Sequence, residues 1–458
     1  MGQSLISGLD LDLSSMFLLF VTVCAFMIPV VVILPPIPLS KSDALLQTHS
    51  KAGVKPAKSN LRDQHAAEAH ALQPGHPARI HSLVVYPVKS CRGIEVTRSR
   101  VFPQGLEFDR LFTFAQLKSP FPAPVQDAGA ANATKNAEEE KSRHRWEFIT
   151  QRQFARLATV KVDLWQPDEM KLRKQSLRTR EAFLTLRFPW RGHGWRGVWD
   201  VVTTKLGRGV RAEPEREILL PVDFPSEAEI RDKGYAYEEV RIWKDTATAL
   251  NMERDLPEEL RLYLGVSNKL GLFRIDPARL REVYRCAPRK EAAGYQPVTG
   301  FQDAYPLHML NLSSVQKFSS EVPKDQDLKQ LDVLRFRANM MVSGAPAYDE
   351  ETWKRARFKP GTSGLYNDAV FHVSCRTVRC KMPNVDPTSG DRHPREPDKS
   401  LRALRAVDEG APLLGCLGMQ LTPLFEDSVT DDQERAGWVA VGMTVEVEER
   451  GEHVYIKQ

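Results

Sequence analysis

The sequence predicts a β-rich α+β fold behind an N-terminal transmembrane helix. Apolar and polar residues alternate in many short runs, a pattern typical of half-buried strands. Helical patterns are few and short, and strands and helices do not alternate regularly, which disfavours a doubly wound parallel sheet. One uninterrupted apolar stretch near the N-terminus predicts the membrane segment. A chain of 458 residues, of which 42% are hydrophobic, is long enough for two or three domains.

Residues 16–34 form this apolar stretch, after a short N-terminal tail of residues 1–15. The stretch carries no charge, and its length is close to the roughly 20 residues that a spanning helix needs. A cleaved signal peptide is disfavoured because acidic residues but no basic residue precede the stretch, and no small-x-small cleavage site follows. Lysines follow the stretch, so the positive-inside bias predicts a single-pass protein whose C-terminal domain is cytosolic.

Two segments are expected to lie outside the folded domains. Residues 35–78 are polar, rich in Ala, Pro, His and Lys, and lack apolar periodicity, so we interpret them as a flexible tether. Residues 119–142 contain alanine-rich and glutamate runs, which are typical of an inserted loop.

Strand patterns dominate the remainder of the chain. The expected strands are 80–86, 160–164, 183–188, 239–243, 441–447 and 454–456. Two short helices are expected behind capping boxes, which are formed by Asp255 with Glu258 and by Ser313 with Gln316. Gly265 is the predicted stop signal of the first helix.

Charge and cysteine content narrow the functional classes. A net charge of +5 is compatible with an anionic cofactor or a membrane surface. Nucleic acid is a poor candidate, because basic residues are interspersed with acidic ones and no recognition motif is present. Six dispersed cysteines are too few for a disulfide framework in a chain of this size, so a reducing compartment is expected.

The stretch around Cys380 carries the strongest chemical signal. Arg379 directly precedes this thiol, and a fixed cation favours the thiolate, the form that binds soft metals. A polar turn at residues 385–390 follows and suits an anion bound beside the metal. The combination predicts a soft-metal site next to an anionic group.

Three earlier segments precede the Cys380 stretch. They are Tyr-Pro-Val-Lys-Ser-Cys-Arg-Gly at 86–93, Gly-Leu-Glu-Phe-Asp-Arg at 105–110 and Arg-Phe-Arg-Ala-Asn-Met-Met-Val-Ser-Gly at 335–344. In this order and spacing, the four segments resemble the MOSC family, named after the C-terminal domain of molybdenum cofactor sulfurase. The resemblance covers roughly residues 79 to 450. It implies a MOSC N-terminal β-barrel domain at 79–265 and a C-terminal MOSC β-barrel core at 266–458.

Within that family, a membrane-anchored, stand-alone MOSC protein is most similar to the mitochondrial amidoxime-reducing component. The resemblance implies a molybdenum–molybdopterin cofactor and an oxidoreductase that reduces N-hydroxylated compounds. It also implies a cytochrome b5-type electron donor with its flavin reductase, and a location in the mitochondrial outer membrane.

The resemblance further implies the roles of individual residues. Cys380 corresponds to the metal ligand and is the expected catalytic residue. Lys, Arg and hydroxyl donors suit the phosphate of a pterin cofactor, and an amide suits its ring. The expected cofactor-binding residues are Lys89, Ser90, Arg110, Arg337, Asn339 and Arg379.

Two alternatives remain open at the level of sequence. A carrier or sulfur-transfer protein would hold the cofactor, or a persulfide on Cys380, without reducing a substrate. A zinc-stabilised interaction module would use His372, Cys375, Cys380 and His393 as ligands. In the molybdenum interpretation, Cys91 and Cys375 are structural.

Overall fold

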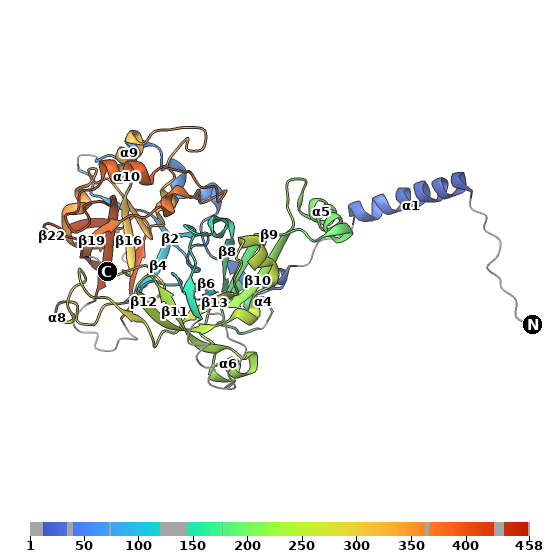
Figure 1. The fold of residues 1–458 in the computed structure, drawn as a ribbon, viewed down its shortest axis with the longest axis horizontal. Helices are drawn as coiled ribbons and strands as arrows, with labels where there is room; N and C mark the ends of the chain where they lie inside the picture. The colour runs from blue at the N-terminus through green and yellow to red at the C-terminus, as the bar shows by residue number, and fades with distance from the viewer. Residues whose placement is uncertain are drawn as a thin grey trace, which may run out of the picture. The chain divides into compact units, whose positions relative to one another are not determined.

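The computed structural model describes residues 12–33, 40–72, 75–119, 144–175, 177–361, 366–425 and 435–456. The chain divides into two compact units (Figure 1), Met1–Ala44 with Pro189–Glu217 and Leu45–Phe188 with Ile218–Gln458. The predicted β-rich α+β class is confirmed. Apart from Ser119, the predicted insertion at 119–142 lies outside the described residues.

The smaller unit holds the two longest helices in the described part of the chain. They are α1 (Leu13–Ile33) and α5 (Gly194–Arg208). Within α1, the window Leu13–Val30 has a mean hydropathy of 2.3 and carries at most two charged residues. Among the described residues, α1 is the one helix long and apolar enough to cross a membrane. The sequence analysis did not predict α5.

A five-stranded closed barrel lies in the larger unit. Its strands are β6 (Phe112–Lys118), β7 (Arg145–Phe148), β11 (Ala236–Ile242), β12 (Asp245–Asn251) and β13 (Leu270–Ile275). The barrel closes because β7 pairs with both β6 and β11. Buried aromatic and aliphatic side chains such as Phe273 and Ile242 fill it. Since β13 belongs to this barrel, the barrel extends past the domain boundary proposed at 265/266.

An eight-stranded sheet forms the second β layer of the larger unit. Its strand order is β17-β16-β20-β19-β18-β22-β2-β3. The strands are β2 (Arg79–Val85), β3 (Ile94–Val96), β16 (Leu307–Asn311), β17 (Met340–Ser343), β18 (Trp353–Lys359), β19 (Ala369–Val378), β20 (Cys416–Leu424) and β22 (Thr444–Arg450). In addition, β17 at one end of this order pairs with β2 near the other end. The early strand β2, drawn in blue, therefore lies among strands of the orange and red C-terminal part (Figure 1).

Smaller sheets and short helices complete the described fold. The remaining strands are β1 (His49–Lys51), β8 (Lys161–Pro167), β9 (Phe183–Pro189) and β10 (Glu215–Pro221) in one sheet, β4 (Arg98–Phe102), β5 (Gly105–Leu106) and β21 (Gly437–Ala440) in a second, and β14 (Arg281–Glu282) with β15 (Val298–Thr299). The remaining α-helices are α2 (Ala67–His70), α4 (Glu169–Lys174), α6 (Glu227–Lys233), α7 (Glu258–Leu264), α8 (Lys290–Ala293), α9 (Leu312–Glu321) and α10 (Asp398–Leu404). The 3-10 helices are η1 (Lys41–Gln47), η2 (Pro56–Lys58), η3 (Asn60–Asp63), η4 (Ala155–Thr159), η5 (Glu253–Asp255), η6 (Val333–Phe336), η7 (Asp349–Thr352) and η8 (Met382–Asn384).

Five of the six expected strands are observed at or close to their predicted positions, and the sixth, at 454–456, is wrong. The backbone N–H of Tyr455 donates to Asp408 Oδ1 at 2.8 Å, and that of Ile456 donates to Cys286 Sγ at 3.4 Å. These backbone N–H groups therefore donate to side-chain atoms, whereas in a strand they would donate to the carbonyls of a neighbouring strand.

Both expected helices are present as α7 and α9, but their predicted caps are wrong. Pro257 occupies the N-cap of α7, and Asp255 instead accepts a hydrogen bond from the Tyr235 hydroxyl. Asn311 caps α9 by accepting from Ser313 N at 3.2 Å. Gly265 ends α7 in the left-handed conformation with φ of 74°, as predicted.

The flexible tether predicted for residues 35–78 is wrong for residues 40–72. These residues form β1, which pairs with β8, and several short helices. Leu61 is 7% exposed and belongs to the apolar core that also contains Val84 and Tyr86. His70 Nε2 donates to the backbone carbonyl of Asp63 at 3.0 Å. Single buried apolar residues, and not a repeating pattern, attach this segment to the core, so its sequence shows no apolar periodicity.

Candidate functional site

Turns and strand ends of the larger unit surround a cavity of about 850 Å³. Its wall is built from the turn after β2, the segment after β5, the loop before β16, the η6–β17 connection and the end of β19. All seven predicted site residues line this cavity: Lys89, Ser90, Arg110, Arg337, Asn339, Arg379 and Cys380. The fold therefore gathers candidates that are widely separated in the sequence.

Three of these residues lie in backbone conformations that are uncommon outside glycine. The φ angles of Ser90, Arg110 and Arg337 are 67°, 50° and 54°. Each such residue costs on the order of 1 kcal/mol, and such conformations concentrate at ligand sites. Backbone hydrogen bonds hold two of the turns, from Arg110 N to Tyr86 O at 2.7 Å and from Arg337 N to Leu334 O at 3.1 Å.

Asp109 is a buried carboxylate that contacts two residues of the cavity wall, Arg110 and Asn339. It accepts hydrogen bonds from Arg110 Nη1 at 2.6 Å, from Tyr86 N at 2.8 Å and from Asn339 Nδ2 at 3.0 Å. A carboxylate buried in this way requires such donors, because desolvation otherwise opposes its ionised form. Asp109 therefore fixes Arg110 and Asn339 against the strand β2.

Most hydrogen bonds of the Arg110 and Asn339 side chains are made to other atoms of the protein. Arg110 donates to Asn339 Oδ1 at 2.9 Å and to the Arg337 carbonyl at 3.1 Å. Asn339 Nδ2 also donates to Val84 O at 3.2 Å, so both of its amide donors are engaged. Asn339 lies on the cavity wall as a residue that positions Arg110.

Arg337 is arranged differently from Arg110. Its Nη1 donates to Cys91 O at 2.8 Å, and its guanidinium lies 4.2 Å from the centre of the Tyr86 ring. Its Nη2 is buried and has no hydrogen-bond partner among the described residues. Burial lowers the pKa of Arg337 to about 10, so the side chain remains cationic at neutral pH. An unpaired buried donor costs about 1–3 kcal/mol, a cost that an anionic ligand in the cavity would remove.

Arg379 and His308 supply two further unpartnered nitrogen atoms. Arg379 Nη2 donates to Phe336 O at 2.8 Å, whereas Arg379 Nε and His308 Nε2 have no hydrogen-bond partner among the described residues. Burial lowers the pKa of Arg379, an effect that the neighbouring Cys380 opposes. Burial also holds the pKa of His308 well below its usual value, so its imidazole is neutral.

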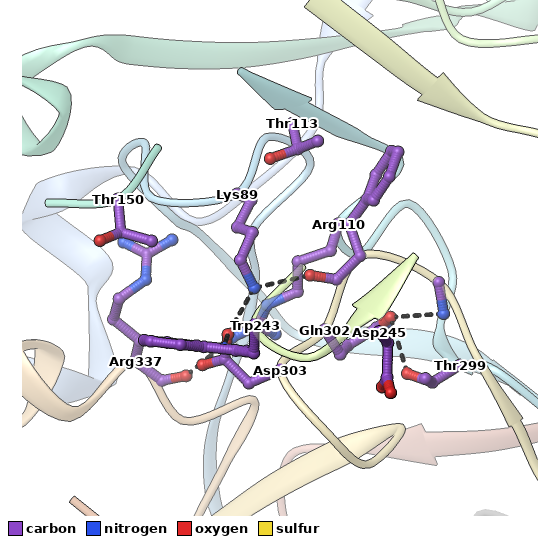
Figure 2. A network of polar contacts seen from close by, with 12 residues as sticks. Lys89, Arg110, Thr113, Thr150, Trp243, Asp245, Thr299, Gln302, Asp303 and Arg337 are labelled. Atoms are coloured by element: carbon purple, nitrogen blue, oxygen red, sulfur yellow. Dashed lines mark hydrogen bonds and ion pairs between the residues drawn. The ribbon is translucent and has the colours of Figure 1, made fainter. Parts of the chain in front are cut away.

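Lys89 and Asp303, which both line the cavity, form an ion pair (Figure 2). Lys89 Nζ donates to Asp303 Oδ1 at 2.6 Å and to Phe301 O at 2.7 Å, and Trp243 Nε1 also donates to Asp303 Oδ1 at 3.0 Å. Burial lowers the pKa of Lys89, while the Asp303 carboxylate opposes that shift. The Lys89 charge is thus partly compensated inside the protein.

Cys380 is distinct from the other cysteines of the larger unit. It is half-buried, and it is the one cysteine of the described chain that lines the cavity. Cys91 and Cys416 are buried, and burial raises the pKa of each thiol to about 12. Cys375 is also buried and packs in a small cluster with Tyr305 and Cys286. This placement agrees with structural roles for Cys91 and Cys375.

The zinc alternative loses its support. His393 accepts from Glu396 N through Nδ1, and its Nε2 lies 2.7 Å from Asp325 Oδ2. Within the described part of the chain, the metal-ligating side chains that group together are Asp63, His70 and His81, none of which belongs to the proposed quartet.

The polar turn at 385–390, which was expected beside a bound anion, is not part of the cavity wall. The Asp386 side chain organises this turn by accepting hydrogen bonds from its backbone, and it also pairs with Arg335.

Comparison with known protein families gives two matches. Residues 77–190 match the MOSC N-terminal beta barrel domain, and residues 296–451 match the MOSC domain. This chain is a MOSC-domain protein. The first match contains Lys89, Ser90 and Arg110, and the second contains the four remaining predicted site residues.

Curated relatives of this MOSC-domain protein cover only parts of it. Mitochondrial amidoxime reducing component 2 of Rattus norvegicus is 26% identical over 125 residues, which are 27% of this chain and 32% of the relative. Mitochondrial amidoxime-reducing component 1 of Danio rerio is 27% identical over 148 residues, 31% of this chain and 38% of the relative. Molybdenum cofactor sulfurase of Oryza sativa subsp. japonica is 30% identical over 146 residues, 30% of this chain and 16% of the relative. The chain therefore spans about a third of the length of the amidoxime-reducing components that it matches.

The sequence analysis did not single out two residues at this site: His308 lines the cavity, and Asp109 contacts the wall residues Arg110 and Asn339. His308 lies within β16, all of whose residues are buried, so its strand pattern carried no functional signal. Gly418, with φ of 85°, makes room for it, since a Cβ there would lie 2.5 Å from His308 Nε2. Asp109 directly precedes Arg110 in a motif that was noted, and a buried acid next to a site arginine is the signal that could have identified it.

These residues suit an anionic cofactor that carries a soft metal. Arg337 and Arg379 offer buried nitrogen donors that lack protein partners, and Cys380 offers one thiol in the same cavity. Guanidinium groups suit phosphate, and thiolate suits soft metals. The cavity volume also falls within the usual range of ligand sites, roughly 300–1,000 Å³.

Proposed function

We propose that this MOSC-domain protein binds a molybdenum–pterin cofactor and reduces N-hydroxylated compounds such as amidoximes. The observation that carries the proposal is the convergence of all seven predicted site residues on one cavity with unpartnered cationic donors. The names of the partial relatives, amidoxime-reducing component and molybdenum cofactor sulfurase, support the same chemistry.

In this proposal, each residue has a distinct role. Arg337 and Arg379 bind the anionic part of the cofactor through their unpartnered nitrogens, and Lys89 and Ser90 bind its phosphate. Arg110 and Asn339 hold the wall in place through Asp109. Cys380 is the protein ligand of the metal, because a thiolate is a soft donor.

The proposed reaction needs two electrons and two protons for each N–O bond that is cleaved, and it releases water. When bound, the cofactor supplies the two-electron chemistry. The protein supplies a recessed cavity, a neutral imidazole at His308 and a fixed set of cations. Electrons come from a cytochrome b5-type donor with its flavin reductase in this proposal.

Helix α1 is the proposed membrane anchor. Its length and composition fit a span, and it lies near the N-terminus. The proposed location is the mitochondrial outer membrane, with the C-terminal domain in the cytosol. An anchor there would hold the MOSC domain close to a membrane-bound electron donor.

A carrier or sulfur-transfer protein is the second candidate. The sulfurase relatives favour it, since one from Caenorhabditis briggsae is 30% identical over 94 residues. Such a protein would use the same cavity and Cys380, either to hold the cofactor or to carry a persulfide, without reducing a substrate.

Replacing Cys380 tests the proposal. Cys380→Ser should keep the fold but lose reduction of benzamidoxime with a cytochrome b5 electron supply, because a serine hydroxyl is a hard donor that does not ionise at neutral pH. Cys375→Ser is the matched control and should retain most activity, since Cys375 lies outside the cavity wall. Molybdenum and pterin contents are measured in both purified proteins.

Other outcomes would contradict the reductase proposal in distinct ways. A Cys380→Ser protein as active as the parent would exclude Cys380 as the ligand. A parent protein with bound pterin or labile sulfur on Cys380, but no reductase activity with the supplied donor, would favour the carrier or sulfur-transfer protein.

A further inference from the structure

Helix α5 carries a large, exposed apolar face. Trp195 is 89% exposed and Trp199 is 63% exposed, values that are unusual for tryptophan. Val198, Val202 and Leu206 are also between 41% and 49% exposed. At 3.6 residues per turn, these five side chains fall within an arc of about 100° along the helix.

The opposite side of α5 is small and faces the protein. The buried residues of the helix are Gly197, Thr203 and Thr204. A Cβ at Gly197 would lie 2.0 Å from the carbonyl oxygen of Gly192, so the backbone approaches its neighbour too closely for any larger residue. The helix therefore buries its small side and exposes its tryptophans, the reverse of an ordinary surface helix.

Basic residues surround this apolar face. Between residues 190 and 211 the chain has five basic residues and one acidic residue. Exposed Arg196 and Lys205 lie about 100° and 80° from Trp195 on opposite sides of the helix, so they flank the apolar arc. Tryptophan prefers the interface between lipid and water, and basic side chains at its edges suit anionic headgroups.

Helix α5 also belongs to the same compact unit as the apolar helix α1. If α1 enters a bilayer, the segment that shares its unit is held near the lipid surface. A lipid surface accounts for the tryptophans, the aliphatic residues and the flanking cations together, because tryptophan favours the interface between lipid and water and cations favour anionic headgroups.

We propose that α5 is an interfacial helix that lies in the plane of an anionic membrane surface. Its apolar arc inserts at the boundary between headgroups and acyl chains, and Arg196 and Lys205 contact the phosphates. The small unit thus has two membrane contacts, α1 and α5, and this inference does not depend on the reaction catalysed by the larger unit.

The test measures vesicle binding by α5 without the contribution of α1. In the full-length chain, Leu19→Arg with Val23→Arg places two charges in α1, which oppose its insertion into a bilayer. This protein should still sediment with vesicles that contain phosphatidylserine, and less with phosphatidylcholine alone or at high salt. Adding Trp195→Ser and Trp199→Ser should weaken binding by roughly tenfold or more.

The control replaces two exposed apolar residues outside α5, Leu262→Ser with Tyr284→Ser, which are 49% and 61% exposed, and should leave vesicle binding unchanged. In the otherwise unmodified chain, brominated lipids should quench tryptophan fluorescence, and the Trp195/Trp199 variant should lose that quenching. Vesicle binding that is absent, or unaffected by the tryptophan substitutions, would overturn the proposal. Self-association of the chain that depends on these tryptophans would instead identify a second copy as the occupant of the face.

Discussion

At the residue scale, the two arginines beside Tyr86 have different tasks although both line the cavity. Arg110 is paired with the buried Asp109 and with Asn339, so it forms part of the wall. Arg337 has one engaged nitrogen and one buried nitrogen without a partner among the described residues. The side chain with an unused donor is the better candidate for direct contact with a ligand.

Arg337→Ala should therefore reduce cofactor retention without unfolding the protein. The loss of a charged hydrogen bond costs about 1.5–3 kcal/mol, or roughly 10- to 150-fold in affinity. The pterin content of the purified protein and its thermal unfolding temperature measure the two effects separately. Full pterin occupancy in this variant would exclude Arg337 from cofactor binding.

Arg110→Ala serves as the comparison at the neighbouring arginine, which donates to the Arg337 carbonyl at 3.1 Å. It leaves the buried carboxylate of Asp109 without its cation, and breaking a buried pair in this way costs about 3–5 kcal/mol of folding stability. We thus expect Arg110→Ala, unlike Arg337→Ala, to lower the unfolding temperature.

At the scale of elements, residues 40–72 behave as part of the fold. Strand β1 pairs with β8, and Leu61 packs into the core beneath α9 and β2. Single apolar contacts and hydrogen bonds to backbone carbonyls hold this segment in place. Such isolated contacts leave no periodic pattern of apolar residues for sequence analysis to detect.

Leu61→Ala should destabilise the folded protein by about 2–5 kcal/mol, the usual cost of removing a buried leucine side chain. Leu72→Ala is the control within the same segment, because Leu72 is 56% exposed and its loss should change the free energy of unfolding little. Denaturant unfolding of the two variants provides the measurement. Equal stability of both would support the flexible tether.

At the scale of the whole molecule, the chain combines an apolar helix, a closed five-stranded barrel and an eight-stranded sheet. The strands of the two β layers do not follow the order of the sequence. Strand β2 comes from the region that matches the MOSC N-terminal beta barrel domain, but it pairs with β17 and β22 of the region that matches the MOSC domain. The cavity therefore requires both matched regions.

Protease treatment of intact organelles should remove the larger unit if α1 is an anchor with the positive-inside orientation. Acidic residues precede the apolar stretch and lysines follow it, and from this pattern the positive-inside bias predicts a cytosolic C-terminal domain. Immunoblotting for a C-terminal epitope measures the outcome, and the Leu19→Arg/Val23→Arg variant should be released into the soluble fraction. A C-terminal domain that stays protected until detergent is added would reverse the proposed orientation.

The sequence by itself determined the β-rich class, the apolar helix and the residues of the candidate site. Alternation identifies strands because side chains point to opposite faces, and a long uncharged run identifies a span because lipid excludes charge. Cys380 and the basic residues were identifiable because their motifs occur in one order, and all seven line the cavity.

Only the tertiary structure decided which side chains are already satisfied and which are free to bind. Asn339 and Arg110 have partners from distant segments, whereas Arg337 Nη2 has none among the described residues, and no local pattern separates these cases. The same holds for α5. Its spacing of apolar residues defines one face, but only the structure shows that this face is exposed while Gly197, Thr203 and Thr204 are buried, because packing depends on residues that the chain brings together only when it folds.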